Sequence, residues 1–336
     1  MRLPICVRAL GLASLALLVA AAANAQDFYA GKSLTIIVGY APGGGVDTGA
    51  RLIARHIGGF IPGRPGVVVQ NMPGAAGLVA ANHIYAIAQG DGLTLAVPGR
   101  EWPIANALKQ SGAQFDALKL GWIGSSGPVN VIAWVRPDSG IASIEDLQRA
   151  KQKVIIGGLG SATVTVSLPR LLAAHSLPFS VIPNYDSTAS ILLAIERGEV
   201  TGIFTQESTF GRRHDLIDSK LVVPILQSEP QLAGVPLARD LLPASALPLL
   251  EAVSSSSAFG LPLVGPPGLP VERLAVLRKA FIEMAQSPSF QKDAIKNAEP
   301  VGFAIEGGKL AAIVAEVVTA MDPALVDSYR RLTEEK

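Results

Sequence analysis

A run of glycines directly after an apolar stretch carries the clearest potential for chemistry in this sequence. Glycine has no Cβ and accepts positive φ angles, so a ligand can approach its backbone closely. Backbone N–H groups at the start of a helix bind anions. The turn therefore predicts an anion site, and the alternative is a structural turn that only closes a strand–helix unit. The residues of this predicted site are Pro42, Gly43, Gly44, Gly45, Asp47 and Thr48.

Residue types argue against a nucleotide phosphate as the anion. A Walker-type phosphate loop needs Gly-Lys-Ser/Thr, and no lysine occurs between Lys32 and Lys109. In the dinucleotide fingerprint the third glycine would stand where this chain has Thr48. The next apolar run ends in Gln70 and Asn71, without an acid to bind a ribose. A carboxylate is therefore the best candidate for the anion.

Arg100 is the cationic residue best placed to bind such a carboxylate. It follows the strand expected at 93–97, at the carboxyl edge of the sheet, where α/β proteins bind their ligands. A guanidinium is always charged and can bind a carboxylate through two hydrogen bonds. The alternative is a solvated Arg100 paired with Glu101. Trp102 is either a stacking surface for the ligand or a packing residue.

Motifs for metal binding and catalysis do not stand out. The four histidines are isolated in the sequence, with no histidine or acid at ligand spacing. The G-x-S-x-G motif of serine hydrolases does not occur, and Ser125 and Ser126 have no histidine near them in the sequence. We therefore expect no catalytic residue, no metal and no cofactor, and we keep a hydrolase only as a remote alternative.

The elements that position these residues alternate between strand and helix. Apolar runs predict strands at 34–38, 67–69 and 93–97. The apolar spacing after the glycines predicts a helix that begins at Asp47 or Thr48 as N-cap. Strands and helices that alternate at these lengths predict an α/β fold with mostly parallel sheets flanked by helices.

Residues 1–25 have the pattern of a cleaved export signal. Arg2 and Arg8 form a positive region before an apolar stretch at 9–23, and an A-x-A cleavage sequence follows at 23–25. Cleavage after Ala25 would remove Cys6, the single cysteine of the chain, so the mature protein would have no disulfide. We therefore expect an exported protein in the periplasm.

The charge of the expected mature chain argues against nucleic acid and anionic membranes as partners. Without Arg2 and Arg8 the 28 basic residues become 26, against 27 acidic residues, so the formal net charge is −1. The remaining length of about 310 residues favours two lobes over a single core. The expected partner is a small molecule.

Three motifs in close succession resemble one protein family. They are P-G-G-G-x-D at 42–47, N-x-P-G-A-x-G at 71–77 and D-G-x-T-L at 91–95. The order and spacing are similar to those of the receptors of tripartite tricarboxylate transporters, the Bug or TctC-like periplasmic binding proteins. Looser likeness at 200–204, 259–261 and 267–270 extends the resemblance over nearly all of the mature chain.

The resemblance implies a two-lobed periplasmic-binding-protein fold of type II, the Venus flytrap. Lobe one would consist of residues 26–128 and 263–336, and lobe two of residues 129–262. Two crossing strands, near 131–135 and 259–264, would form the hinge.

The resemblance also implies the role of the chain. It would be a monomeric receptor for a small organic carboxylate that it delivers to the membrane permease subunits of the transporter. A periplasmic ligand sensor with a signalling partner is the alternative.

The resemblance places a Gly/Ser-rich loop in lobe two, opposite the glycine turn of lobe one. Its residues would bind the ligand through backbone N–H groups and hydroxyls, and here they are Gly160, Ser161, Ala162 and Thr163. The sequence departs from the family pattern from Thr163 onward. Pro169 disfavours a helix interior, so we expect the following helix to begin with Ser167 as its cap.

A further strand, at 200–204, places Thr205 and Gln206 at the same expected cleft. The family usually has an acid at the position of Thr205, so this chain differs from the family there. We include both residues in the predicted site.

Overall fold

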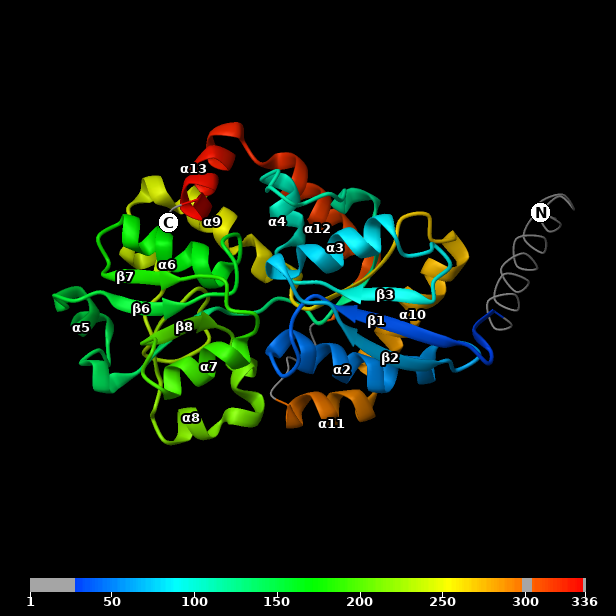
Figure 1. The fold of residues 1–336 in the computed structure, drawn as a ribbon, viewed down its shortest axis with the longest axis horizontal. Coiled ribbons are helices and arrows are strands. Elements are labelled where there is room, and N and C mark those ends of the chain that lie inside the picture. Colours follow the sequence, from blue (N-terminus) through cyan, green and yellow to red (C-terminus); the bar gives the residue numbers. More distant parts are fainter. Residues whose placement is uncertain (1–27, 298–303, 335–336) are drawn as a thin grey trace, which may run out of the picture.

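The structure is a computed structural model that describes residues 28–297 and 304–334. The expected export signal at 1–25 lies outside the described residues. Two β-sheets, each flanked by helices, form two lobes that lie side by side (Figure 1). Among the described helices, none has the length and apolar character needed to cross a membrane.

The first sheet has six strands in the order β11-β4-β10-β3-β1-β2. Strand β1 pairs in parallel with β2 and β3, whereas β10 runs antiparallel to β3 and β4. The sheet is mixed because β10 enters it from a distant part of the chain in the opposite direction. Its strands are β1 (Ser33–Val38), β2 (Gly66–Asn71), β3 (Thr94–Val97), β4 (Gly121–Ser125), β10 (Pro262–Gly265) and β11 (Ile305–Glu306).

Helices of the first lobe cover this sheet with apolar faces. Helix α2 buries Leu52, Ile53 and Ile57, whose spacing predicts one apolar face of a helix. Strand β1 is buried from Ile36 to Val38, as its β-branched composition indicates. The helices are α2 (Gly45–Ile57), α3 (Leu78–Ala86), α4 (Trp102–Ala107), α10 (Val271–Gln286), α11 (Pro288–Lys296) and α12 (Gly307–Ala320).

The second sheet has five strands in the order β7-β6-β8-β5-β9. Strand β6 is parallel to β7 and β8, and β5 is antiparallel to β8 and β9. Its strands are β5 (Ile132–Val135), β6 (Val154–Gly157), β7 (Phe179–Ile182), β8 (Gly202–Thr205) and β9 (Val223–Gln227). The helices around it are α5 (Ile144–Arg149), α6 (Val164–Ala174), α7 (Thr188–Glu196), α8 (Asp215–Asp218) and α9 (Leu247–Ser254).

Helix α6 corrects one expectation from the sequence. It begins at Val164 with Thr163 as N-cap, and Pro169 lies inside it, so the expected start at Ser167 is wrong. Every residue from Val164 to Leu172 is buried. Tertiary packing supplies most helix stability in proteins, so it outweighs the hydrogen bond that the proline cannot donate. The hydroxyl of Ser167 instead donates to the Thr163 carbonyl oxygen at 3.0 Å.

The C-terminal helix α13 (Pro323–Glu334) packs against α6 and α9 of the second lobe (Figure 1). Tyr329 is fully buried there, with its hydroxyl 3.4 Å from that of Ser167. Arg170 donates through Nη1 to the Leu332 carbonyl oxygen at 2.7 Å. The last helix of the segment that we expected in lobe one therefore lies on the other lobe.

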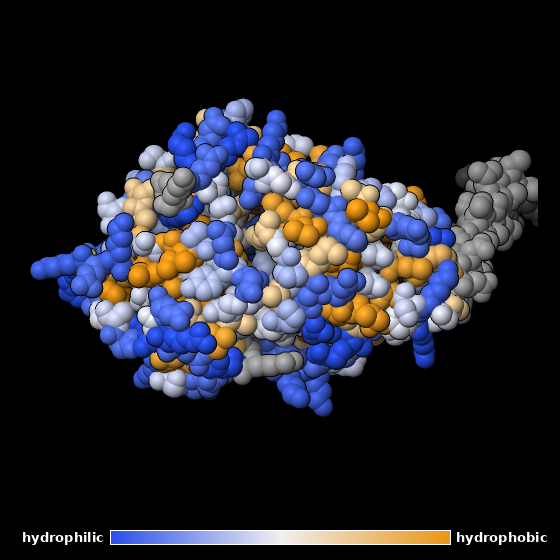
Figure 2. Space-filling view, viewed as in Figure 1, coloured by the Kyte–Doolittle hydropathy of each residue, from blue (hydrophilic) through white to orange (hydrophobic). Residues whose placement is uncertain are grey.

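The face of the molecule in Figure 2 shows apolar areas interspersed with polar residues over both lobes. The most exposed large apolar side chain, Val271, is 81% exposed at the start of α10. Single exposed apolar residues are normal on protein surfaces. The apolar residues on this face therefore do not identify a binding site.

Candidate functional site

The glycine turn connects β1 to α2 at the boundary between the lobes. Helix α2 begins at Gly45 with Gly44 as its N-cap, so the expected N-cap role of Asp47 or Thr48 is wrong. Glycine is an acceptable N-cap, and the acid is free to bond back from the first turn. Gly43 has a φ angle of +90°, which a residue with a side chain rarely adopts. The strand–turn–helix unit itself forms where the sequence predicts it.

Asp47 holds this turn together. Its carboxylate accepts hydrogen bonds from the Gly43 N–H at 2.9 Å and the Asn71 amide at 2.8 Å, and it pairs with Arg51 at 3.0 Å. Burial acts to raise the pKa of Asp47, but these bonds to Arg51, Asn71 and Gly43 outweigh it and lower the pKa below its usual value. The residue is 3% exposed. Its oxygens are thus used inside the turn, and its predicted ligand contact gains no support from them.

One backbone donor of the turn, the Gly45 N–H, bonds to the second lobe. The Gly45 N–H donates to Oγ1 of Thr188, the first residue of α7, at 3.1 Å. A Cβ on the buried Gly44 would come within 2.9 Å of the same oxygen. The Thr48 N–H donates to the Gly44 carbonyl oxygen within the helix. In this structure the Gly45 N–H therefore donates to a protein hydroxyl, and an anion could bind this N–H only by displacing the Thr188 hydroxyl.

The Gly/Thr loop of the second lobe packs against the first lobe at Ala76. A Cβ added to Gly160 would clash with that of Ala76, so the two backbones approach closely. The Thr163 hydroxyl donates to the Gly160 carbonyl oxygen at 2.7 Å and lies 2.6 Å from the hydroxyl of Thr165. Ala162 and Thr163 are buried and Ser161 is partly exposed. The Thr163 hydroxyl therefore stabilises the loop itself.

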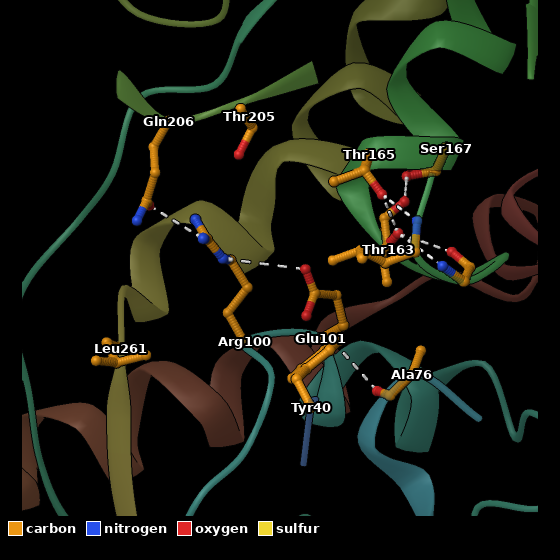
Figure 3. Close-up of polar contacts among 12 residues, drawn as sticks. Tyr40, Ala76, Arg100, Glu101, Thr163, Thr165, Ser167, Thr205, Gln206 and Leu261 are labelled. Atoms are coloured by element: carbon orange, nitrogen blue, oxygen red, sulfur yellow. Dashed lines mark hydrogen bonds and ion pairs between the residues drawn. The ribbon is translucent and has the colours of Figure 1, made fainter. Parts of the chain in front are cut away.

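Arg100 lies between the two lobes (Figure 3). Its Nη2 donates to Oε1 of Gln206, from the end of β8, at 3.0 Å, and its Nε lies 3.9 Å from Oε1 of Glu101. The side chain is only 16% exposed, so the solvated alternative is wrong. Its Nη1 is buried and has no hydrogen-bond partner among the described residues. The guanidinium thus keeps one donor for an additional acceptor.

Glu101 is the N-cap residue of α4 and is 7% exposed. Burial raises the pKa of its carboxyl, against the opposing effects of Arg100, the Tyr40 hydroxyl and the Val164 backbone N–H. The Val164 N–H belongs to the first residue of α6, so Glu101 reaches across the lobe boundary. The Tyr40 hydroxyl lies 3.2 Å from the Ala76 carbonyl oxygen as well, so its single proton is shared between that oxygen and the Glu101 carboxylate. Both lobes therefore hold the Glu101 side chain.

Trp102 and Thr205 lie in different surroundings in the structure. Trp102 is fully buried and packs against Phe115 with ring centroids 5.6 Å apart, which favours its packing role over stacking on a ligand. Thr205, at the end of β8, is 6% exposed, and its hydroxyl lies 2.6 Å from that of Thr209. Thr205 and Gln206 therefore reach the lobe boundary, and their contact with a ligand stays a prediction.

A cavity of about 40 Å³ lies where these groups meet. Of the predicted residues, it brings together Gly45, Arg100, Thr205 and Gln206. Pro42 and Gly43 lie exposed at the rim of the turn, and the Gly160–Thr163 loop supports the cavity without being part of its lining. The lining residues that sequence reasoning missed are Tyr40, Val46, Glu101, Val131, Leu159, Val164, Thr165, Thr188, Phe204 and Thr209.

Two of these missed residues have a local signal in the sequence. Tyr40 stands directly before the glycine turn, and Thr188 follows Ser187, which caps α7 by accepting from the Ser190 N–H. The sequence pattern predicts that a helix starts here, but it does not predict that this helix start contacts the glycine turn of the first lobe. In 28–297 and 304–334, no cluster of three or more His, Cys, Asp or Glu side chains is arranged to hold a metal ion.

No family model and no curated protein matches this chain. Solved structures share its fold over nearly its whole length. The periplasmic binding protein BugD has a TM-score of 0.69 and 19% identity, covering 92% of this chain and 100% of BugD. MatC from Rhodopseudomonas palustris, solved with bound malate, has a TM-score of 0.67 and 19% identity, covering 90% of this chain and 99% of MatC.

A second R. palustris protein, solved with adipate, has a TM-score of 0.67 and 17% identity, covering 90% of this chain and 97% of its own. These likenesses confirm the two-lobed α/β fold of periplasmic binding proteins. The similarity to BugD agrees with the family that the sequence motifs resemble. BugD is described as a periplasmic binding protein, and the two R. palustris proteins are described as solved with malate and with adipate.

Proposed function

We propose that this protein is an extracytoplasmic receptor of the Bug or TctC type that binds a small organic carboxylate between its lobes. It delivers that carboxylate to the membrane permease subunits of a tripartite tricarboxylate-type transporter. The fold supports this proposal, and two proteins with the same fold were solved with malate and adipate. The export pattern at 1–25 supports a periplasmic location.

The observation that carries the proposal is the position of Arg100. Its guanidinium lies in the cavity between the lobes, held by Gln206, and its buried Nη1 has no partner among the described residues. An unsatisfied buried donor is costly, particularly on a charged group. A carboxylate would satisfy it through charge-assisted hydrogen bonds, which are about twice as strong as neutral ones.

The size of the cavity indicates that the lobes must move. It measures about 40 Å³, whereas pockets for small ligands have volumes of about 300–1,000 Å³. The lobes are therefore closed around Arg100, with the Thr188 hydroxyl accepting from the Gly45 N–H, while a separate cavity of about 290 Å³ lies on the other side of the turn, beside Gly43 and Thr48. We propose that the lobes open and close about the segments near 131–135 and 259–264, by the hinge motion of periplasmic binding proteins.

A thermal-shift screen of the chain from Gln26 onward tests the function. The probes are malate, succinate and adipate, with the corresponding diamides as uncharged controls. A carboxylate at 100 times its Kd should stabilise the protein by about 2.7 kcal/mol, and the diamides should have no effect. Calorimetric titration then gives the affinity. Failure of every organic carboxylate to stabilise or bind the protein would contradict the proposal.

Uptake measurements test the proposed partner. Cells that carry the receptor and permease genes should accumulate the identified carboxylate, and deletion of the receptor should abolish that uptake. Unchanged uptake after the deletion would exclude the transport role, although the binding site itself would stand.

A further inference from the structure

Glu101 and Arg100 balance each other's charge in the lining of the interlobe cavity. Oε1 of Glu101 lies 3.9 Å from Nε of Arg100, so the two charges attract each other without a direct hydrogen bond (Figure 3). Both side chains are largely buried, and the other described lining residues carry no charge. Before a ligand binds, the described part of the lining is therefore neutral as a whole.

A carboxylate bound to Arg100 would upset this balance. Under the proposed function it accepts from Nη1, the buried donor that has no partner among the described residues. The cavity would then hold two carboxylates beside one guanidinium, with no second cation among the described lining residues. When two carboxylates share a buried site, the pKa of one of them rises strongly. The cavity therefore binds an anion best together with a proton.

We infer that Glu101 takes up one proton from the solvent when a carboxylate binds to Arg100. The inference rests on the proposed function, because it requires an anion on Arg100. The ligand retains its charge, since it accepts charge-assisted hydrogen bonds directly from Nη1. Glu101 has no such bond to the guanidinium at 3.9 Å, so it loses less by becoming neutral. A new O–H bond forms on Glu101, and a buffer molecule gives up the proton.

The Tyr40 hydroxyl offers the protonated Glu101 a hydrogen-bond acceptor. In the free protein this hydroxyl shares its proton between the Glu101 carboxylate and the Ala76 carbonyl oxygen, which lies 3.2 Å away. Once protonated, Glu101 can donate to the Tyr40 oxygen while Tyr40 donates to Ala76. The added proton therefore leaves no buried donor of this group without an acceptor.

The groups that face Glu101 do not compete for this proton near neutral pH. Arg100 is always charged. Tyr40 and Tyr329 are the titratable groups that interact with Glu101 from β1 and α13, and burial raises the pKa of both hydroxyls above its usual value. Helix α6 faces it with a backbone N–H, which does not titrate. Burial also raises the pKa of Glu101 in the free protein, so a further rise on binding brings it towards neutral pH.

Calorimetric titration in two buffers tests the inference. The probes are malate, succinate and adipate, each titrated in phosphate and in Tris, because the ionisation enthalpies of these buffers differ. The difference between the binding enthalpies gives the number of protons that each bound ligand brings with it. The titrations run from about pH 6.5 to about pH 8.5, where the carboxylates of the probes are ionised.

Wild-type protein should take up a proton on binding within this range. Because the complex carries the extra proton, the affinity should fall as the pH rises, by up to about tenfold in Kd per pH unit. Glu101→Gln retains the size of the side chain but has no carboxyl group, so it should bind without proton uptake and with a constant Kd. The matched control is Glu272→Gln, at an exposed acid of α10, which should behave like wild type.

Infrared difference spectra of wild-type protein locate the proton. Binding should produce the C=O band of a protonated carboxyl group. The band should keep its position when the carboxylates of the probe are labelled with a heavy carbon isotope, because the proton lies on the protein. A band that shifts with the label would place the proton on the ligand and overturn the inference.

The outcomes separate this inference from the proposed function. Binding without proton uptake at any pH in the range would overturn the inference and leave the carboxylate receptor intact. Equal proton uptake by wild type and Glu101→Gln would also overturn it. Wild-type protein that binds no carboxylate would overturn both. Should Glu101→Gln not fold, the infrared measurement on wild-type protein decides alone.

Discussion

The two sides of the cleft are built from different chemistry. The first lobe contributes the charged groups, Arg100 and Glu101, and stabilises its glycine turn with the carboxylate of Asp47. The second lobe faces them with the hydroxyls of Thr165 and Thr188 and with the neutral amide of Gln206. Charge-assisted hydrogen bonds are about twice as strong as neutral ones. Under the proposed function, the first lobe would recognise the charge of the ligand, and the second lobe would add weaker contacts when the lobes close.

The largest expected effect concerns the ionic support of the first turn. Asp47→Ala removes a buried carboxylate and leaves Arg51, Asn71 and the Gly43 N–H without their acceptor. Arg51 is 41% exposed and can be solvated, so the cost comes mainly from the buried hydrogen bonds that Asn71 and the Gly43 N–H lose. Each such bond to a charged group is worth about 1.5–3 kcal/mol, so the free energy of unfolding should fall by about 3 kcal/mol or more. Denaturant unfolding measures it, and Asp138→Ala, at an exposed carboxylate, is the matched control with a small expected change.

Asp47 also makes a prediction about pH. Because its pKa is lowered in the folded state, its stabilising effect is present above the ordinary pKa of a carboxyl and is lost as the pH falls through the lowered value. Wild type and Asp47→Asn should therefore differ in stability at neutral pH and converge in acid. A difference that stays constant down to strongly acidic pH would show that Asp47 acts without its charge.

The second effect concerns ligand affinity and compares the two sides directly. Arg100→Ala should weaken binding of an identified ligand by about 2–5 kcal/mol, or about 30-fold to several-thousand-fold. Gln206→Ala, its neutral partner across the cleft, should cost only about 0.5–1.5 kcal/mol. Arg100→Lys keeps the charge but loses the planar fork, so it should bind less tightly than wild type. Equal affinities of wild type and Arg100→Ala in calorimetry would remove Arg100 from the site.

The third effect tests the neutral support of the second loop. Thr163→Val preserves the shape of the side chain but removes the donor to the Gly160 carbonyl oxygen and the partner of the Thr165 hydroxyl. Leaving such buried groups unsatisfied costs about 1–3 kcal/mol in unfolding free energy. If Thr163→Val lowered the free energy of unfolding as much as Asp47→Ala, the glycine turn with its carboxylate would not be the more strongly stabilised of the two loops.

The smallest effect concerns closure without ligand. Thr188→Val removes the acceptor of the Gly45 N–H, a neutral bond worth about 0.5–1.5 kcal/mol. The ligand-free protein should then populate the open form more, with a larger radius of gyration in small-angle scattering. Ser190→Ala is the control, because that hydroxyl bonds to Ser187 within the second lobe. A radius identical to that of wild type would show that this bond does not hold the lobes together.

Local patterns predicted the elements and part of the site. The β-branched residues of β1 and the apolar spacing of α2 determine these elements by themselves, so the glycine turn between them was found. Arg100 can be proposed from the sequence because it directly follows a predicted strand, and its ligand contact stays a prediction. The cap of α2 was misplaced because both Gly44 and Asp47 are residue types common at helix starts, and only the packing decides between them.

The remaining parts depend on contacts between distant segments. Thr188 meets Gly45 from 143 positions away, and Gln206 meets Arg100 from 106 positions away. The packing of the lobes sets such pairs, and no local pattern records it. Pro169 shows the same limit, because burial along α6 overrides its poor helix propensity.

The placement of α13 also makes the chain suitable as an optical reporter of its own motion. Its described N-terminal end lies at the first lobe and its C-terminal helix on the second (Figure 1). Cys6, the single cysteine, falls within the segment expected to be removed on export. Cysteines introduced at the exposed Lys32 and Glu334 would therefore be the dye sites of the mature protein. Energy transfer between two such dyes would follow opening and closing in real time, with no fused fluorescent domain.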